Sequence, residues 1–232
     1  MIKAVFLDFY GTLVRFTPSV EYIQQRVSKE HGLKINLASI VNAYPVVDKY
    51  MADENARKLI SSRSHLEQIA FFTEYEQRLL AATGHHVSND LAATIWHQVN
   101  KTHKSLSLYD DAIPTLKSLK KANMVVGIIT NMNANIGPVL ERLGIADWIN
   151  FSTTSSEVGL GKPHKPIFEN ALKKASVNPN EALHIGDQYE GDFLGAKSAG
   201  LYALYLNRTL KVPPKDGKSI SKLTEVTAFI VN

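Results

Sequence analysis

The sequence contains no cysteine, which excludes a disulfide scaffold, a cysteine-ligated zinc site and a thiol nucleophile. No apolar run approaches the roughly 18 residues that a membrane-spanning helix needs, so we expect no membrane association. The N-terminal segment turns acidic at Asp8, too early for a signal peptide, and the expected location is therefore cytoplasmic. Low-complexity stretches and internal repeats are also absent, and 44% hydrophobic residues are typical of a folded protein.

A strong charge of one sign is missing as well. The chain has 26 basic and 22 acidic residues, and its formal net charge is +4. The lysine clusters at residues 117–121 and 173–174 are typical of solvated helix faces, so the sequence does not favour a nucleic-acid partner. A length of 232 residues allows one large domain or two modest ones.

Short apolar runs alternate with helical patterns over much of the chain. The runs predict buried strands at residues 4–7, 125–129, 182–185 and 202–206. Helices are predicted at residues 113–122, 136–143, 166–175 and 191–199, several of them bounded by proline or glycine. Strands that alternate with helices of this length predict βαβ units, and hence an α/β protein with a Rossmann-like parallel sheet.

Residues 15–107 show a different pattern, because helical periodicity continues there without a strand. Helices are predicted at residues 20–31, 37–50, 57–82 and 90–103, with breaks at Gly32, near Asp53 and at Gly84. We therefore expect two domains: an α/β core of residues 1–14 and 108–232, and an inserted bundle of about four helices at residues 15–107. Residues 211–218, with paired prolines, predict a surface loop.

Polar or glycine-bearing segments follow the first three predicted strands. They are residues 8–13 (Asp-Phe-Tyr-Gly-Thr-Leu), 130–131 (Thr-Asn) and 186–192 (Gly-Asp-Gln-Tyr-Glu-Gly-Asp), and residues 159–163 (Gly-Leu-Gly-Lys-Pro) precede the last. Parallel sheets bind ligands beyond the carboxyl ends of their strands, so we expect these segments to share one edge. Three aspartates gathered there would repel one another. A lysine and a divalent cation would offset that repulsion, and hard oxygen ligands favour Mg²⁺.

In their order and on their strand ends, the four segments resemble the four motifs of the haloacid dehalogenase-like hydrolase superfamily. The insertion at residues 15–107 resembles the helical cap that this superfamily carries between its first and second motifs. The resemblance covers essentially the whole chain.

The resemblance implies a nucleophile and a metal site. Asp8 would attack phosphorus and form an aspartyl-phosphate. Asp8, the backbone carbonyl of Tyr10 and Asp187 would hold Mg²⁺, and Asp192 would orient the metal's waters or the motif lysine. An anionic nucleophile can then meet an anionic substrate, because the bound cations offset the repulsion.

The remaining motif residues would bind the substrate. Thr130 would donate a hydrogen bond to the transferring phosphoryl group, helped by backbone N–H groups near Asn131. Lys162 would neutralise both Asp8 and the phosphoryl oxygens as a point charge. The implied partner is a small phosphorylated molecule.

One position departs from the phosphatases of this superfamily, most of which carry a second aspartate two residues after the nucleophile. Tyr10 stands there, as tyrosine does in 2-haloacid dehalogenases. The fourth motif instead favours phosphoryl transfer, because Gly186-Asp187 is the metal-binding version and dehalogenases resemble Ser-Ser-Asn at that place. No obvious halide site is present; Arg57 and Arg63 are candidates by rough position.

We therefore favour Mg²⁺-dependent hydrolysis of a phosphomonoester or an acyl phosphate. A phenol, with a pKa near about 10, can donate a proton at neutral pH but is a poor base, and this would be the role of Tyr10. One alternative is a 2-haloacid dehalogenase in which Asp8 attacks carbon. Another is a binding protein that keeps the fold and turns over weakly because Tyr10 has replaced the acid/base.

Some of these residues also have a plainer interpretation. Asp192 is equally consistent with an N-cap of the helix that follows it. Tyr10 is equally consistent with packing against the helical insertion. His164 is a candidate base next to Lys162, although loop histidines are more often solvated. Phe71, Phe72 and Trp96 are expected in the core of the insertion.

Overall fold

Two compact units divide the chain in the computed structural model, which describes residues 1–132, 135–208 and 218–230. The α/β unit comprises Met1–Arg15 and Ser107–Asn232, and the helical unit comprises Phe16–Leu106. The surface loop predicted at residues 211–218 lies almost entirely outside the described residues. No helix in the described part of the chain is long and apolar enough to cross a membrane.

A parallel six-stranded sheet forms the centre of the α/β unit, with the strand order β5-β4-β1-β6-β7-β8. The strands are β1 (Ala4–Leu7), β4 (Val125–Thr130), β5 (Phe151–Thr154), β6 (Ala182–Gly186), β7 (Tyr202–Leu206) and β8 (Ser219–Ile220). The four predicted strands are confirmed. β5 and β8 were not predicted, because β5 reads Phe-Ser-Thr-Thr and β8 has two residues. The fold class is thus α/β and Rossmann-like, as predicted.

The register of the central strands places the ends of β1, β4 and β6 next to one another. Leu7 of β1 is paired with Ile128 of β4 on one side and with Ile185 of β6 on the other. All four residues of β1 are buried, as the apolar run predicts for a central strand covered on both faces. The residues that follow β1, β4 and β6 therefore emerge at one edge of the sheet.

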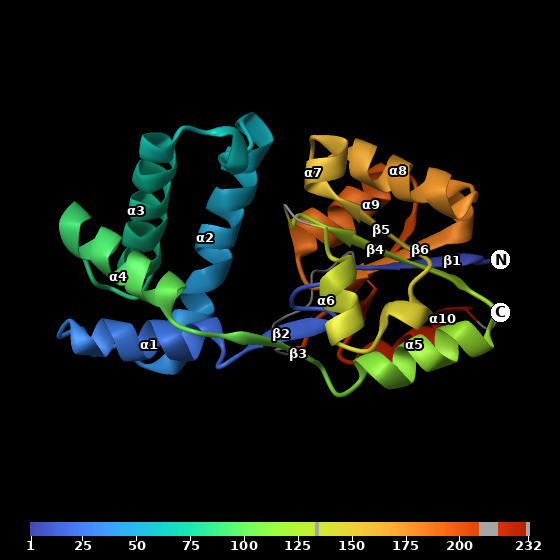
Figure 1. Ribbon diagram of the computed structural model, residues 1–232, viewed down its shortest axis with the longest axis horizontal. Coiled ribbons are helices and arrows are strands. Elements are labelled where there is room, and N and C mark those ends of the chain that lie inside the picture. The colour runs from blue at the N-terminus through green and yellow to red at the C-terminus, as the bar shows by residue number, and fades with distance from the viewer. Residues whose placement is uncertain (133–134, 209–217, 231–232) are drawn as a thin grey trace. The chain divides into compact units, whose positions relative to one another are not determined.

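Helices cover both faces of this sheet (Figure 1). On one face lie α7 (Ser155–Val158), α8 (Lys165–Ala175) and α9 (Gly195–Ser198); on the other lie α5 (Ala112–Lys121), α6 (Gly137–Arg142) and α10 (Thr227–Ile230). Short 3-10 helices are η2 (Ala146–Trp148), η3 (Pro179–Glu181) and η5 (Leu223–Val226). One prediction needs correction: residues 191–199 do not form a single helix. A π-helical segment, η4 (Tyr189–Leu194), precedes α9 instead.

Four long helices form the helical unit: α1 (Val20–Glu30), α2 (Leu37–Arg57), α3 (His65–Ala82) and α4 (Asn89–Lys101), with the short η1 (Ile60–Ser62). The break predicted near Asp53 is wrong, because α2 continues to Arg57. The next long helix begins at His65 and not at residue 57, because Ser64 and Glu67 form a capping box.

Apolar side chains from all four helices fill the core of the helical unit, among them Ile23, Ile40, Leu79 and Ile95. The aromatic residues predicted there do pack together. Phe71 is 3% exposed, and Phe72 stacks on Trp96 with ring centroids 4.4 Å apart. Arg63 pairs with Glu54 and lies over the Phe71 ring, so it makes its contacts within this unit.

Two short strands, β2 (Val14–Thr17) and β3 (Ser105–Leu108), pair where the chain runs from one unit to the other. The expectation that residues 15–107 contain only helices is therefore wrong at both ends. The strands escaped prediction because neither is buried as a whole, so neither shows an uninterrupted apolar run.

Candidate active site

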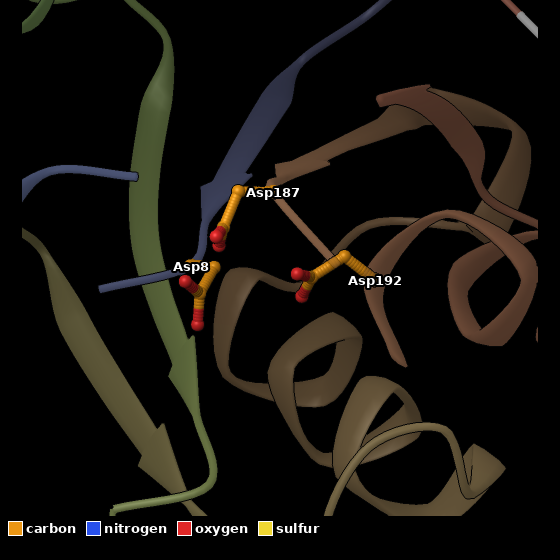
Figure 2. Close-up of side chains that lie close together, drawn as sticks. All are labelled: Asp8, Asp187 and Asp192. Carbon is orange, nitrogen blue, oxygen red and sulfur yellow. The ribbon is translucent and has the colours of Figure 1, made fainter. Parts of the chain in front are cut away.

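Three carboxylates meet at the carboxyl edge of the sheet. Asp8 follows β1, Asp187 follows β6, and Asp192 lies within η4. Their nearest oxygens all lie within 4.8 Å of one another, and Figure 2 shows the three side chains gathered at the strand ends. Asp8 is 6% exposed and Asp192 is fully buried. The structure therefore brings together the three aspartates that the sequence placed at one edge.

Lys162 lies between two of these carboxylates. Its Nζ donates to Asp8 Oδ1 at 2.6 Å and to Asp192 Oδ1 at 2.5 Å, and the residue is 5% exposed. A buried ammonium with two carboxylate partners is well satisfied, and the same contacts fix the position of a flexible side chain.

Asn131 holds the loop that carries Lys162. Its Oδ1 accepts a hydrogen bond from the Lys162 backbone N–H at 2.7 Å, and its Nδ2 donates to the Lys162 carbonyl at 3.0 Å. A Cβ at Gly161 would lie 2.5 Å from Asn131 Oδ1, so only glycine permits this approach. The amide of Asn131 thus acts on the lysine loop, a contact that the sequence did not predict.

The carboxylate of Asp192 has three donors. Oδ1 accepts from Lys162 and lies 3.0 Å from His184 Nε2, and Oδ2 accepts from the backbone N–H of Gln188 at 3.0 Å. A Cβ at Gly186 would overlap the Asp192 carboxylate. The helix-cap interpretation of Asp192 is wrong, because the N-cap of α9 is Leu194 and the Asp192 carboxylate turns back to Gln188.

Asp187 has a different environment, because it forms no salt bridge with any of the described residues. The Thr12 hydroxyl lies 3.4 Å from its Oδ1. Gly11 has φ +85° and packs so closely against the carboxylate that a Cβ there would overlap it. The loop after the predicted nucleophile therefore forms one wall of the Asp187 site.

Burial raises the pKa values of the three carboxyl groups, whereas the charge of Lys162 lowers them. Burial raises the pKa of Asp8, and Lys162 opposes this only in part. Burial and the neighbouring Asp8 and Asp192 raise the pKa of Asp187 well above its ordinary value. Burial also acts on Asp192, but Lys162 and His184 outweigh it and hold the pKa of Asp192 below its usual range.

The pKa of Lys162 is raised despite burial, because Asp192 and Asp8 stabilise its charge. One buried cation therefore faces three carboxylates, of which those of Asp8 and Asp192 are buried and that of Asp187 is partly buried. Hard oxygen donors with an excess of negative charge are suited to a divalent cation such as Mg²⁺.

The other predicted residues lie in the loops of this edge. Thr130 ends β4, is 2% exposed, and its Oγ1 accepts from the Met132 N–H at 3.2 Å. Tyr10 is 37% exposed. The Nε2 of His164 is buried without a hydrogen-bond partner among the described residues, so a purely solvated role for this ring is wrong. No hydrogen bond in the described chain joins His164 to the aspartates.

Sequence reasoning missed two residues that support the site. His184 lies inside β6, and its apolar neighbours led us to treat the whole segment as a buried strand. A single histidine within that strand was the one feature of the sequence that could have indicated a polar contact. Arg208 lies after β7 and pairs with both oxygens of Asp111 at 2.9 Å. Arg208 also donates to the carbonyls of Gly11 and Thr12, at 3.2 and 2.7 Å, and so fixes the loop after Asp8.

A Rossmann-like sheet with a strand-end aspartate, a buried lysine and two further carboxylates defines a hydrolase of the haloacid dehalogenase type. The family model of the haloacid dehalogenase-like hydrolases matches residues 2–200. The chain belongs to this family and is an enzyme.

Similar proteins include both phosphatases and dehalogenases. The glyceraldehyde 3-phosphate phosphatase of Methanocaldococcus jannaschii is 27% identical, over 100% of this chain and 98% of that protein. The magnesium-bound structure of YfnB from Bacillus subtilis has a TM-score of 0.67 at 17% identity and covers 100% of this chain and 99% of that one. A 2-haloacid dehalogenase from Pseudomonas syringae has a TM-score of 0.59 at 25% identity, with 98% and 97% covered.

Proposed function

We propose that this hydrolase is a Mg²⁺-dependent phosphatase that acts on small phosphomonoesters or acyl phosphates through an aspartyl-phosphate on Asp8. The observation that carries the proposal is the cluster of the buried Asp8 and Asp192 with the partly buried Asp187, in which Lys162 is the one cation among the described residues. The phosphatase from Methanocaldococcus jannaschii, similar over the whole chain, supports the same reaction class.

Asp8, Asp187 and the backbone carbonyl of Tyr10 would hold the Mg²⁺ ion. When bound, the ion would neutralise charge on the phosphoryl oxygens as a Lewis acid. Asp187 suits this role because it is partly buried and forms no salt bridge in the described part of the chain. The donors around Asp192 favour its second predicted role, orienting Lys162. Its other predicted role, at the metal site through the metal's waters, stays a prediction.

In the first step Asp8 attacks phosphorus. Lys162 occupies Oδ1 of Asp8, so we assign the attack to Oδ2, which forms the new P–O bond while the ester P–O bond breaks. Thr130 and the backbone N–H groups near Asn131 would bind the phosphoryl oxygens. Tyr10 would donate a proton to the leaving oxygen.

In the second step water attacks the phosphorus of the aspartyl-phosphate, which releases phosphate and restores the Asp8 carboxylate. This water needs a base. The phenolate that proton transfer to the leaving oxygen would produce regains its proton from solvent at neutral pH, and the resulting phenol serves poorly as a base. We therefore expect slow turnover and a preference for leaving groups that need no proton, such as nitrophenolate or the carboxylate of an acyl phosphate.

The test is a screen of phosphorylated metabolites and nitrophenyl phosphate with added Mg²⁺, run beside chloroacetate and 2-chloropropionate. We expect phosphate release that EDTA abolishes and that Asp8→Asn lacks. Asp110→Asn is the matched control, because the Asp110 side chain is 98% exposed and its ion-pair partner is Arg15. Chloride release that survives EDTA, without phosphate release, would contradict the proposal.

The second candidate is a 2-haloacid dehalogenase, favoured by Tyr10 two residues after Asp8 and by the likeness to the Pseudomonas syringae enzyme. Asp8 would attack the halogen-bearing carbon, halide would leave, and water would hydrolyse the ester. This reaction creates no need for a metal. Asp187, which forms no salt bridge with any of the described residues, then has no role, which is why we rank the phosphatase first.

A further inference from the structure

His184 occupies an unusual place for an imidazole. It lies in the middle of β6, between Leu183 and Ile185, and is fully buried. In the sheet it is paired with Phe6 of β1 and Ala203 of β7, and the Phe168 ring meets it edge-on at 5.3 Å. Its surroundings are thus almost entirely apolar, and burying two ring nitrogens there is costly unless both are hydrogen-bonded.

Only one of the two ring nitrogens has a hydrogen-bond partner among the residues that the structure describes. Nε2 lies 3.0 Å from Asp192 Oδ1, and an ionised carboxylate oxygen only accepts, so Nε2 carries the hydrogen. Nδ1 is buried and has no hydrogen-bond partner among the described residues. An aliphatic side chain would fill the same space without an unpaired nitrogen. The single contact with Asp192 is therefore what distinguishes histidine at this position.

That contact determines how Asp192 is held. Lys162 and His184 both donate to Oδ1, and the Gln188 N–H donates to Oδ2. The three donors approach from different elements and fix the plane of the carboxylate. Without His184, Oδ1 would keep only the lysine, which is the mobile partner because its four-carbon chain has many rotamers.

We propose that His184 is a positioning residue that fixes the Asp192 carboxylate and thereby keeps Lys162 Nζ beside Asp8 Oδ1. Its effect on catalysis rests on the proposed function, in which Lys162 neutralises Asp8 and the phosphoryl oxygens. The hydrogen stays on Nε2 throughout, and His184 neither touches substrate nor transfers a proton.

Two substitutions of matched shape separate the hydrogen bond from packing. Gln in His184→Gln can place an amide donor where Nε2 lies, whereas His184→Met has a side chain of similar length without a donor. We expect His184→Met to lower kcat on nitrophenyl phosphate about 10–100-fold, the range for outer partners of catalytic groups. KM should change little, and His184→Gln should recover most of kcat. Thermal unfolding of both variants reports whether each is folded.

Equal loss in the two variants would overturn the proposal, because packing alone would then explain it. A kcat for His184→Met equal to that of the wild type would overturn it as well.

A second measurement needs no activity. Long-range ¹H–¹⁵N NMR of the intact wild-type protein should show the Nε2–H tautomer for His184, with a chemical shift that changes in Lys162→Met through their shared acceptor. An Nδ1–H tautomer, or a signal indifferent to Lys162, would overturn the proposal even if neither His184 variant folds. Absence of phosphatase activity together with the expected NMR result would instead refute the proposed function and leave the contact established.

Discussion

Glu76 gives the helical unit a stability that depends on pH. The residue lies on α3, is 1% exposed, and its Oε1 accepts a hydrogen bond from Gln24 Nε2 of α1 at 2.5 Å. No salt bridge compensates its charge in the part of the chain that the structure describes. Burial raises the pKa of Glu76 to about 7, and the bond from Gln24 opposes this only in part.

The size of the effect follows from the two pKa values. The ordinary value is 4.5, so between about pH 4.5 and about pH 7 the folded protein keeps a proton that the unfolded chain has lost. This contribution to the free energy of unfolding is complete below the unfolded pKa and is lost as pH rises through the folded pKa. At about 1.36 kcal/mol per pKa unit, the loss is about 3 kcal/mol.

The Glu76→Gln substitution should remove this dependence, because an amide of the same shape does not ionise. We expect the variant and the wild type to differ little near about pH 5, and the variant to be more stable by about 3 kcal/mol near about pH 8. Urea unfolding across this range measures the difference, and hydrogen exchange of the α1 and α3 amides assigns it to the helical unit.

Glu74→Gln is the matched control on the same helix. Glu74 is half-exposed and pairs with Arg78, which lowers its pKa, so this variant should differ from the wild type by a constant amount over the same range. If the stability gained by Glu76→Gln does not change with pH, Glu76 is not buried as the structure has it and the reasoning fails.

Three further predictions concern the active site. Mg²⁺ should raise the melting temperature, because it binds only the folded state. The Asp187→Ala variant should lose this increase, and the control variant Asp110→Ala should keep it. An increase that survives Asp187→Ala would place the ion elsewhere. Tyr10→Asp should gain steady-state activity on alkyl phosphates relative to nitrophenyl phosphate, since an aspartate can serve as both acid and base; no gain would assign the base to another residue. Arg208→Lys should lower kcat/KM on the order of 10-fold, because lysine cannot bridge Asp111 and two loop carbonyls. The control Arg142→Lys should have no effect, because Arg142 is an exposed residue of α6.

The sequence was sufficient for the parts of the fold that local pattern determines. Buried central strands such as Ala4–Leu7 show as uninterrupted apolar runs, and the residues after them were expected at one edge because parallel strands share their direction. By contrast three of the four residues of β5 are polar and the strand depends on its partner β4, so its pattern carried no signal. The end of α2 and the start of α3 were misplaced because the Ser64–Glu67 capping box outweighed the helical propensity around residue 57.

The site shows the same division. Asp8, Lys162 and Asp187 were found because they stand in recognisable segments, and Asp8 and Asp187 directly follow strands. The contacts of Asn131, His184 and Arg208 depend on which loops the tertiary structure brings together across long stretches of chain. The partner of His184 could not be inferred from its place in an apolar strand, because the contact with Asp192 forms only when the chain folds η4 back against β6.

The proposed aspartyl-phosphate on Asp8 can be tested most directly by a rapid acid quench of the wild-type enzyme during turnover of nitrophenyl phosphate. Mass spectrometry of the peptide that contains Asp8 then detects the phosphoryl group. We expect a Mg²⁺-dependent phosphoryl group on Asp8 that forms and decays within turnover, and no such group in Asp8→Asn. Phosphate release without any phosphoryl group on Asp8, or a phosphoryl group on a different residue, would contradict it.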